Sequence, residues 1–533
     1  MSIEKCEFTG KVNQIKQNTN RKGSLSERSA VSGAFAAAFL LAVFLLSNTA
    51  ATTAKSRQTD SINATFAEQK LMASDGVVGD QFGNGVAISG DTAVVGANAY
   101  GATVGGPGAA YVFVRSGNSW ALQQKLTASD GATDDAFGSD VAISGDTIIV
   151  GAFGDTTGAN TGQGSAYIFV RSGTAWTQQQ KLTAGDGAGF DNFGYTVSIA
   201  GDTAVAGSPG SNIGANGDQG AAYVFTRSGT AWTQQQKLTA ADGLAADVFG
   251  NSVGLAGDTV VVSAPEDTTG GNIQQGSAYV FTRTGTVWTQ QQKLTASDAT
   301  IYDYFGFSIA VSGDTVVIGT QEDIGTSFQQ GSAYVFTRSG TAWTQQQKLT
   351  ANDGAANDTF GNSVAIAGDM VIVSAAGDTN GTNQRQGSAY LFTRTGTAWT
   401  QGQKLTASDG AAGDFFGTSV SISGSTALVG AFGDTIGANS FQGSAYVFTS
   451  SATVSGRVLT PDGRNLRNAI VSLIDSQGVR RTATSSSFGV YSFADVRTGD
   501  TYTLTVSSKR YRFTPLIMPI NDNLANLDFV GLE

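Results

Sequence analysis

The chain has no histidine among its 533 residues. Histidine is the usual general base near neutral pH and the commonest zinc ligand. Its absence therefore excludes serine–histidine and cysteine–histidine nucleophile pairs and most catalytic zinc sites. The single cysteine, Cys6, precedes an apolar N-terminal segment. If that segment is removed, the mature protein has neither a thiol nor a disulfide, and burial and hydrogen bonding must stabilise it.

Proline is scarce, with six residues, whereas glycine is abundant, with 70. This combination excludes collagen and proline-rich linkers, and it indicates many tight turns between short strands. Acidic residues outnumber basic ones, and the formal net charge is −11. A nucleic-acid partner needs a basic surface for its phosphates, so none is expected.

The N-terminal residues 1–54 have the pattern of an export signal. Basic residues outnumber acidic ones in 1–29, an apolar run extends from Ala30 to Leu46, and small residues dominate 47–54. This order is typical of a signal peptide, here with cleavage near Ala51, or of an uncleaved signal anchor. Residues 55–64 then form a linker. We expect a secreted or cell-surface protein that meets a membrane only through an uncleaved N-terminal segment.

Self-comparison gives the strongest signal in the chain, because three short elements recur seven times in step. The first is a Phe-Gly pair at intervals of 55 or 56 residues, with its phenylalanine at Phe82, Phe137, Phe193, Phe249, Phe305, Phe360 and Phe416. The second is Gly-x-Ala-Tyr, with its tyrosine at Tyr111, Tyr167, Tyr223, Tyr279, Tyr334, Tyr390 and Tyr446. The third is Lys-Leu, with its lysine at Lys70, Lys125, Lys181, Lys237, Lys293, Lys348 and Lys404.

Each repeat predicts four antiparallel strands, A to D. In the second repeat these are Ser139–Ser144, Thr147–Ala152, Ser165–Arg171 and Trp176–Thr183. Gly-Asp and Ser-Gly dipeptides between A and B and between C and D favour tight hairpins. Strand D, Trp-Thr-Gln-Gln-Gln-Lys-Leu, is mostly polar, as expected of an exposed edge strand. Four short strands in about fifty residues are typical of a propeller blade.

The repeat region begins and ends partway through a repeat. The first element met is the strand D motif Gln69-Lys70-Leu71, and the last repeat ends near Ser451 without a strand D. The segment from about Thr65 to Met72 should therefore complete the seventh blade and leave no unpaired edge. We predict an all-β protein whose residues 65–451 form a seven-bladed β-propeller closed by its N-terminal strand.

The repeats resemble FG-GAP repeats of the bacterial kind, named for Phe-Gly and Gly-Ala-Pro, which form the seven-bladed propeller of integrin α subunits. Strand B of the third repeat ends Ala206-Gly207-Ser208-Pro209, and that of the fourth ends Ser263-Ala264-Pro265. The resemblance covers residues 65–450 and implies binding or adhesion outside the cell. Integrin repeats often carry an Asp-rich calcium loop between A and B. Here that loop is only Ser-Gly-Asp-Thr or a close variant, which is too short for six to eight oxygen ligands, so those calcium sites do not carry over.

The tail, residues 453–533, lacks the repeat. Alternating apolar and polar residues and the turn Pro461-Asp462-Gly463 predict about seven short strands. The tail resembles the carboxypeptidase regulatory-like domain, a transthyretin-type β-sandwich, which implies an accessory module without the zinc peptidase it is named after.

Antiparallel connectivity separates two faces of the predicted ring. The turn face carries the A–B and C–D turns, at 145–146 and 172–174 in the second repeat. The loop face carries the B–C and D–A loops, at 153–164 and 127–138. Every D–A loop has an Asp seven residues before its Phe-Gly phenylalanine and another two before it. The loop face is therefore expected to be acidic, whereas Arg and Asp are expected to pair on the turn face.

The loop-face aspartates have two interpretations. Asp next to Gly forms turns and caps backbone N–H groups, and a residue repeated in every blade is usually architectural. The alternative is weak calcium binding between D–A and B–C loops, with Asp130, Asp135, Asp155, Asp186 and Asp191 as candidate ligands. No other cofactor is expected.

The B–C loops differ most between repeats, and variable loops on a rigid scaffold commonly carry recognition. Five of them supply candidate partner-binding residues, namely Asp155, Asp267, Asp323, Asp378 and Asp434. The leading hypothesis is a non-enzymatic binding or adhesion protein whose propeller loops recognise an extracellular protein or glycan. The alternatives are a structural surface-layer component and a glycosidase built on an Asp pair, which the even distribution of Asp over the blades disfavours.

Overall fold

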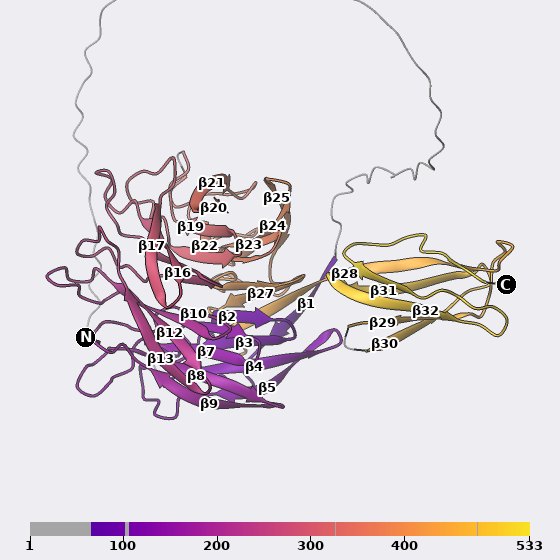
Figure 1. Cartoon of the computed structure of the whole chain (residues 1–533), viewed down its shortest axis with the longest axis horizontal. Helices are drawn as coiled ribbons and strands as arrows, with labels where there is room; N and C mark the ends of the chain where they lie inside the picture. Colours follow the sequence, from indigo (N-terminus) through magenta and orange to yellow (C-terminus); the bar gives the residue numbers. More distant parts are fainter. Residues whose placement is uncertain (1–64, 102–105, 326, 477, 533) are drawn as a thin grey trace, which may run out of the picture. The chain divides into compact units, whose positions relative to one another are not determined.

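The computed structural model describes residues 65–101, 106–325, 327–476 and 478–532, which belong to one compact unit, Asp60–Glu533. The described residues form strands, turns and irregular segments, without an α-helix (Figure 1). In this part of the chain, then, no helical segment has the length and apolarity needed to span a bilayer. The predicted export signal and linker, residues 1–64, lie outside the described residues.

Seven sheets of four strands correspond to the seven repeats, which confirms the predicted propeller. The first consists of β2 (Phe82–Ser89), β3 (Thr92–Ala97), β4 (Ala109–Ser116) and β5 (Ser119–Leu126). The second consists of β6 (Val141–Ser144), β7 (Thr147–Ala152), β8 (Ser165–Ser172) and β9 (Ala175–Leu182). The third consists of β10 (Val197–Ala200), β11 (Thr203–Ser208), β12 (Ala221–Ser228) and β13 (Ala231–Leu238).

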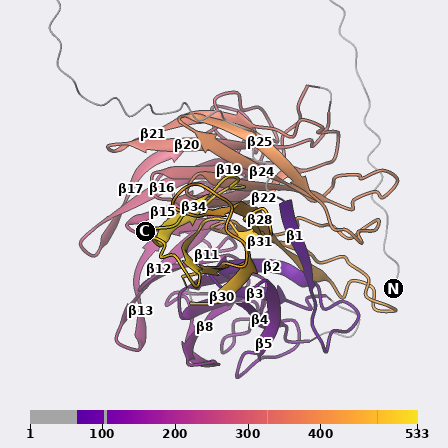
Figure 2. The same ribbon diagram turned by 90° about the vertical axis from the view of Figure 1, so that its right-hand side faces the viewer.

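The later blades repeat this plan. The fourth consists of β14 (Val253–Ala256), β15 (Thr259–Ala264), β16 (Ser277–Thr284) and β17 (Val287–Leu294). The fifth consists of β18 (Ser308–Ser312), β19 (Thr315–Thr320), β20 (Ser332–Ser339) and β21 (Ala342–Leu349). The sixth consists of β22 (Phe360–Ala367), β23 (Met370–Ala375), β24 (Ser388–Thr395) and β25 (Ala398–Leu405). The innermost strands of successive blades contact one another around the ring. Figure 2 views the blades from the side of the C-terminal domain.

The seventh blade joins the two ends of the repeat region. It consists of β26 (Val420–Ser423), β27 (Thr426–Ala431), the first part of β28 (Ser444–Leu459) and β1 (Thr65–Leu71). Strand β1 pairs antiparallel with β28 along its whole length, from Thr65 opposite Ser451 to Leu71 opposite Ala445. Strands β26 and β27 also contact β2 of the first blade. The ring is therefore closed by the N-terminal strand, as the phase of the repeats predicts.

Two of the repeated motifs meet at each junction between blades. Phe193 is fully buried, and its ring packs edge-on against Tyr223 of its own blade with 5.5 Å between ring centroids. Its backbone N–H donates to the carbonyl of Gln163 in the preceding blade, at 2.8 Å. A Cβ on Gly164, whose φ is +84°, would lie 2.1 Å from the carbonyl oxygen of Phe193. The first glycine of Gly-x-Ala-Tyr therefore allows the Phe-Gly backbone of the next blade to approach closely, so the two motifs depend on each other across the blade interface.

The C-terminal residues form a sandwich of two sheets around a core that includes Val471, Leu504 and Phe529. In one sheet the end of β28 pairs with β31 (Val490–Arg497) and β34 (Phe529–Val530). The other has the order β30 (Arg480–Thr484), β29 (Ile470–Ile474), β32 (Asp500–Ser507) and β33 (Leu516–Ile520). Counting the shared strand β28, seven strands build the sandwich, the number that the sequence predicts.

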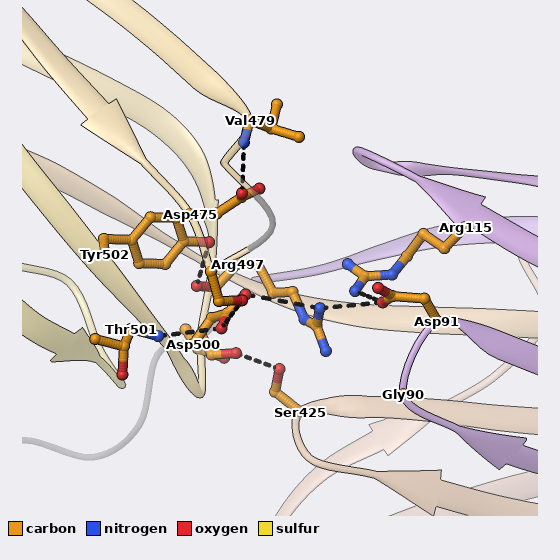
Figure 3. A network of polar contacts seen from close by, with 12 residues as sticks. Gly90, Asp91, Arg115, Ser425, Asp475, Val479, Arg497, Asp500, Thr501 and Tyr502 are labelled. Carbon is orange, nitrogen blue, oxygen red and sulfur yellow. Dashed lines mark hydrogen bonds and ion pairs between the residues drawn. The ribbon is translucent and has the colours of Figure 1, made fainter. Parts of the chain in front are cut away.

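Strand β28 belongs to both domains, and polar contacts surround the point where it passes between them (Figure 3). Arg497 Nη1 lies 3.4 Å from Asp91 Oδ1 in the first A–B turn, and Asp91 also pairs with Arg115. The N–H of Thr498 donates to the carbonyl of Ser450 at 3.1 Å, and the hydroxyl of Ser425 donates to the carbonyl of Thr498 at 2.5 Å. No free linker separates the two domains, because the strand that ends one begins the other.

Candidate functional site

Every blade carries one lysine at the end of strand D on the loop face. In the second blade, Lys181 Nζ lies 2.7 Å from Asp130 of the D–A loop and 2.6 Å from Asp155 of the B–C loop. The hydroxyl of Tyr167 donates to Asp130 at 2.9 Å, and Ser165 donates to Asp155. Asp155 is only 4% exposed. The ammonium group therefore occupies the space between the two carboxylates.

The same lysine–aspartate pair recurs in all seven blades, with separations of 2.6–2.8 Å. The pairs are Lys70–Asp409, Lys125–Asp75, Lys181–Asp130, Lys237–Asp186, Lys293–Asp242, Lys348–Asp298 and Lys404–Asp353. In five blades the lysine meets a second, buried carboxylate. These contacts are Lys70–Asp434, Lys181–Asp155, Lys293–Asp267, Lys348–Glu322 and Lys404–Asp378. The loop face is thus less acidic than its aspartates alone suggest.

Burial and ion pairing shift the pKa values of these groups in opposite directions. Burial alone would raise the pKa of Asp130, but the Lys181 ammonium and the Tyr167 hydroxyl outweigh it and hold that pKa below its usual value. Burial alone would likewise lower the pKa of Lys181, but Asp130 and Asp155 outweigh it and raise that pKa. The cluster is therefore an internal ion pair at neutral pH.

The aspartates two residues before each Phe-Gly phenylalanine have another role. Each accepts a hydrogen bond from the backbone N–H three residues earlier, as from Ala132 to Asp135 at 2.6 Å and from Ala188 to Asp191 at 2.8 Å. Both side chains are nearly fully buried. Burial raises the pKa of Asp135 and of Asp191, against the opposing effect of these N–H groups. They hold the D–A loops in shape, which is the capping interpretation of the sequence.

The five calcium candidates are thus distributed over three environments. Asp130 and Asp186 pair with lysines, Asp155 is buried against Lys181, and Asp135 and Asp191 cap backbone. Within the described ranges, no three His, Cys, Asp or Glu side chains are grouped closely enough to hold a metal ion. The acidic set therefore does not converge on a common point.

The five partner-binding candidates also lie in different environments. Four of them are at most 6% exposed and pair with strand D lysines, namely Asp155, Asp267, Asp378 and Asp434. Asp323 is exposed, and its Oδ1 accepts the N–H of Gln329 at 2.7 Å. In the fifth blade the buried position is occupied by Glu322, whose carbonyl accepts the N–H of Gly331 as that of Asp155 accepts the N–H of Gly164.

The turn face pairs Arg with Asp, as expected, and also ties neighbouring blades together. Arg171 Nε donates to Asp146 at 2.6 Å, Nη1 donates to Thr92 of the preceding blade at 3.2 Å, and the guanidinium lies over the Trp176 ring. At the outer edge, the carboxamide of Gln124 donates to the carbonyl of Trp176 and accepts its N–H, at 2.7 and 2.8 Å. The strand D glutamines thus bridge adjacent blades, a role that sequence reasoning did not assign.

A cavity of about 490 Å³ lies where the innermost strands converge, lined mainly by Ser, Thr and Asn. Of the described residues around it, only Asp140 is charged. Asp140 accepts the N–H of Val197 in the next blade at 2.7 Å, as Ser252 accepts that of Ile309 at 3.1 Å. Burial raises the pKa of Asp140 to about 6 despite these backbone donors. Asp140 therefore accepts the backbone hydrogen bond between blades that a serine hydroxyl accepts at the corresponding position of the fourth blade.

A groove of about 680 Å³ opens on the loop face across the third to fifth blades. Aromatic, amide and carboxylate side chains line it, including Phe190, Tyr195, Asp218, Glu266, Tyr304 and Phe307. Phe190 is 70% exposed and Tyr195 is 42% exposed. Sequence reasoning missed these aromatics because it compared only the B–C loops for differences between repeats, whereas Phe190 and Tyr195 flank the shared Phe-Gly pair. What distinguishes them in the sequence is that most other repeats have no aromatic residue at the same positions.

Seven FG-GAP repeat matches cover residues 66–113, 120–169, 176–225, 232–281, 288–336, 343–392 and 399–448. A carboxypeptidase regulatory-like domain matches residues 453–520. No curated protein matches the chain. Because the seven matches together cover more than half of the 533 residues, the chain belongs to the FG-GAP repeat family and ends in a carboxypeptidase regulatory-like domain.

Proposed function

We propose that this chain is an extracellular, non-enzymatic binding protein that recognises its partner with the loop face of the propeller. Both matched domain families are non-catalytic, and FG-GAP repeats are typical of extracellular binding and adhesion proteins. The export-signal pattern of residues 1–54 supports the location. The loop-face carboxylates that recur from blade to blade are engaged with lysines or backbone N–H groups, which disfavours a glycosidase built on them.

One observation carries the choice of face. Large apolar side chains that remain exposed in the propeller lie almost entirely on its loop face. They are Met72, Val77, Tyr100, Phe190, Tyr195, Leu244, Ile273, Ile301, Tyr302, Phe328 and Phe441. The exceptions among the described residues are Leu122, midway along the edge strand β5, and Val287 on the turn face, whose arginines are already paired. Apolar side chains held at the tips of loops on a rigid ring are characteristic of recognition surfaces.

A paired-face experiment tests this proposal. One variant replaces Phe190, Leu244, Tyr302 and Phe328 by Ser on the loop face. The control variant replaces Val287 by Ser on the turn face. Both are passed over arrays of extracellular glycans and surface proteins beside the unaltered protein. We expect the loop-face variant to lose binding and the control to keep it. Binding that survives the loop-face changes, or that fails only in the control, contradicts the proposal.

A further inference from the structure

The propeller departs from its own symmetry at three positions on the loop face. These positions lie three and one residues before the Phe-Gly phenylalanine and two residues after it. The third blade has Phe190, Asn192 and Tyr195 there, and the fifth has Tyr302, Tyr304 and Phe307. The fourth blade, between them, has Ala246, Val248 and Asn251. Aromatic residues thus flank a blade whose corresponding side chains are smaller.

This difference in size produces the groove. The small residues of the fourth blade lie between Phe190 and Tyr195 on one side and Tyr304 and Phe307 on the other. Pro209 and Pro265, the only prolines that come directly after a strand B, also line it. Its volume of about 680 Å³ falls within the range of ligand pockets. Tyr195, Asn251 and Phe307 line the central cavity as well, so the groove continues into it.

The backbone at these positions makes the aromatic choice costly. Phe190 has φ +65° and Tyr304 has φ +52°, a region that bulky residues seldom adopt. The first and seventh blades use Gly79 and Gly413 at the position of Phe190, where glycine is the unstrained choice. The same positive φ recurs at these positions in the other blades, as at Asp134, Ala246 and Asn357, so the strain belongs to the repeat and the backbone gives no preference for the aromatic side chains.

The polar groups in the groove favour one chemical class. Asp218, Glu266, Asn192 and Gln321 line it, and none of its described residues is Lys or Arg. Gln274 fixes Glu266, to which it donates at 2.9 Å, and it accepts from the Tyr304 hydroxyl at 3.2 Å. The two carboxylates repel anionic ligands, including sulfated glycans and nucleic acids. Carboxylates and carboxamides suit hydroxyl groups, and aromatic faces suit the C–H faces of sugar rings.

We propose that this groove binds a linear, uncharged oligosaccharide, whose rings contact Phe190, Tyr195, Tyr304 and Phe307 and whose hydroxyls bond to Asp218 and Glu266. One end of the saccharide enters the central cavity, where the hydroxyl and carboxamide groups of the inner strands surround it. This assignment rests on the proposed loop-face function and names its ligand class. A concave site with fixed polar groups between aromatic walls suits a thin ligand better than a flat protein surface.

Isothermal titration with neutral hexasaccharides tests the assignment, using β-1,4-glucan, β-1,4-N-acetylglucosamine, β-1,4-xylan and α-mannan probes. At least one should bind, and Phe190→Ala and Tyr304→Ala should each weaken that binding by about tenfold or more. Phe488→Ala, a control at a 72% exposed aromatic of the sandwich, should leave it unchanged. Equal melting temperatures of the variants establish that they are folded.

The remaining outcomes overturn the assignment in distinguishable ways. Binding of heparin instead of neutral saccharides would refute the chemistry, as would saccharide binding that Phe190→Ala leaves unaltered. Binding of a surface protein that Phe190→Ala abolishes, with no saccharide bound, would refute the ligand class and preserve the loop-face function. If neither class binds the loop face, the assignment and the proposed function both fail.

Discussion

Lys70 Nζ lies 2.7 Å from Asp409 Oδ2, although 339 residues separate the two in the chain. The same ammonium lies 2.6 Å from the buried Asp434, and Tyr446 donates to Asp409 at 2.8 Å. Strand β1 therefore supplies the lysine that strand D supplies in the other six blades. Glu68 of β1 likewise accepts the N–H of Ser408, as Gln178 accepts that of Ser129 in the first two blades.

Replacing Lys70 by Met should destabilise the protein strongly. The change leaves Asp434 buried without its cation, and removing one partner of a buried pair costs about 3–5 kcal/mol. Lys237→Met is the matched control, because among the described residues Lys237 forms an ion pair with Asp186 alone, whose side chain is 56% exposed. That loss should stay near 1 kcal/mol. Urea unfolding of both variants measures the difference, and equal losses would contradict the role assigned to the second carboxylate.

Asp358 predicts a pH dependence of stability. Burial raises its pKa from 3.8 to about 6, against the N–H of Ala355 and with a further contribution from the Asp378 carboxylate. Because the folded state favours the protonated form, this group's stabilising contribution is complete below pH ~4 and is lost as the pH rises through 6.

Asp358→Asn removes that titration while keeping an acceptor for Ala355. Relative to the unaltered protein, the variant should gain roughly 1–3 kcal/mol of unfolding free energy between pH 4 and pH 7.5. Urea unfolding at the two pH values measures this gain. A stability difference that is the same at both would show that Asp358 titrates normally in the folded state.

Calcium should not stabilise this propeller. A ligand that binds the folded state raises its melting temperature in a concentration-dependent way. In the second blade, however, Lys181 already lies between Asp130 and Asp155. We expect the same melting temperature in calcium and in a chelator, measured by scanning calorimetry. A saturable rise with calcium would support the cation-binding interpretation of these aspartates instead.

Gln180→Ala should loosen the contact between the second and third blades. The carboxamide of Gln180 donates to the carbonyl of Trp232 and accepts its N–H, at 2.7 and 2.8 Å. Losing both bonds should cost about 1–3 kcal/mol, seen as a lower melting temperature. Gln403→Ala provides the comparison, because exposed Gln403 precedes Lys-Leu in the sixth blade and its carboxamide has no hydrogen-bond partner in the described part of the chain. Equal effects of the two changes would argue against the bridging role.

The fold follows from sequence because its determinants are periodic. The spacing of Phe-Gly predicts the number of blades, and Gln69-Lys70-Leu71 identifies β1 as a displaced strand D. Strand A was predicted to begin at Ser139 but begins at Val141, because Gly151 bonds to both Gly138 and Asp140 and leaves Ser139 as a bulge outside the ladder. Strand B, Thr147–Ala152, has the predicted bounds.

The site was less accessible to the same reasoning. Because the lysine and the aspartates recur in every blade, the sequence does not show which lysine contacts which aspartate. The contact of Lys181 with Asp130 and Asp155 could therefore not be predicted. In the fifth blade, residue type suggested Asp323 as the counterpart of Asp155. The B–C loop there begins one residue sooner than in the second blade, as the bond from the Gln321 N–H to the Asp303 carbonyl shows. Glu322 therefore takes the buried position. The groove depends on neighbouring blades having side chains of different size, which requires three-dimensional adjacency.

The melting temperature of a variant that lacks β1, residues 65–71, tests closure of the ring most directly. Without β1 the edge of β28 is unpaired, and Asp434 loses Lys70. We predict a lower melting temperature for the whole propeller, with partial recovery when a synthetic β1 peptide is added. An unchanged melting temperature would contradict closure by β1, and with it the arrangement of blades on which the recognition face depends.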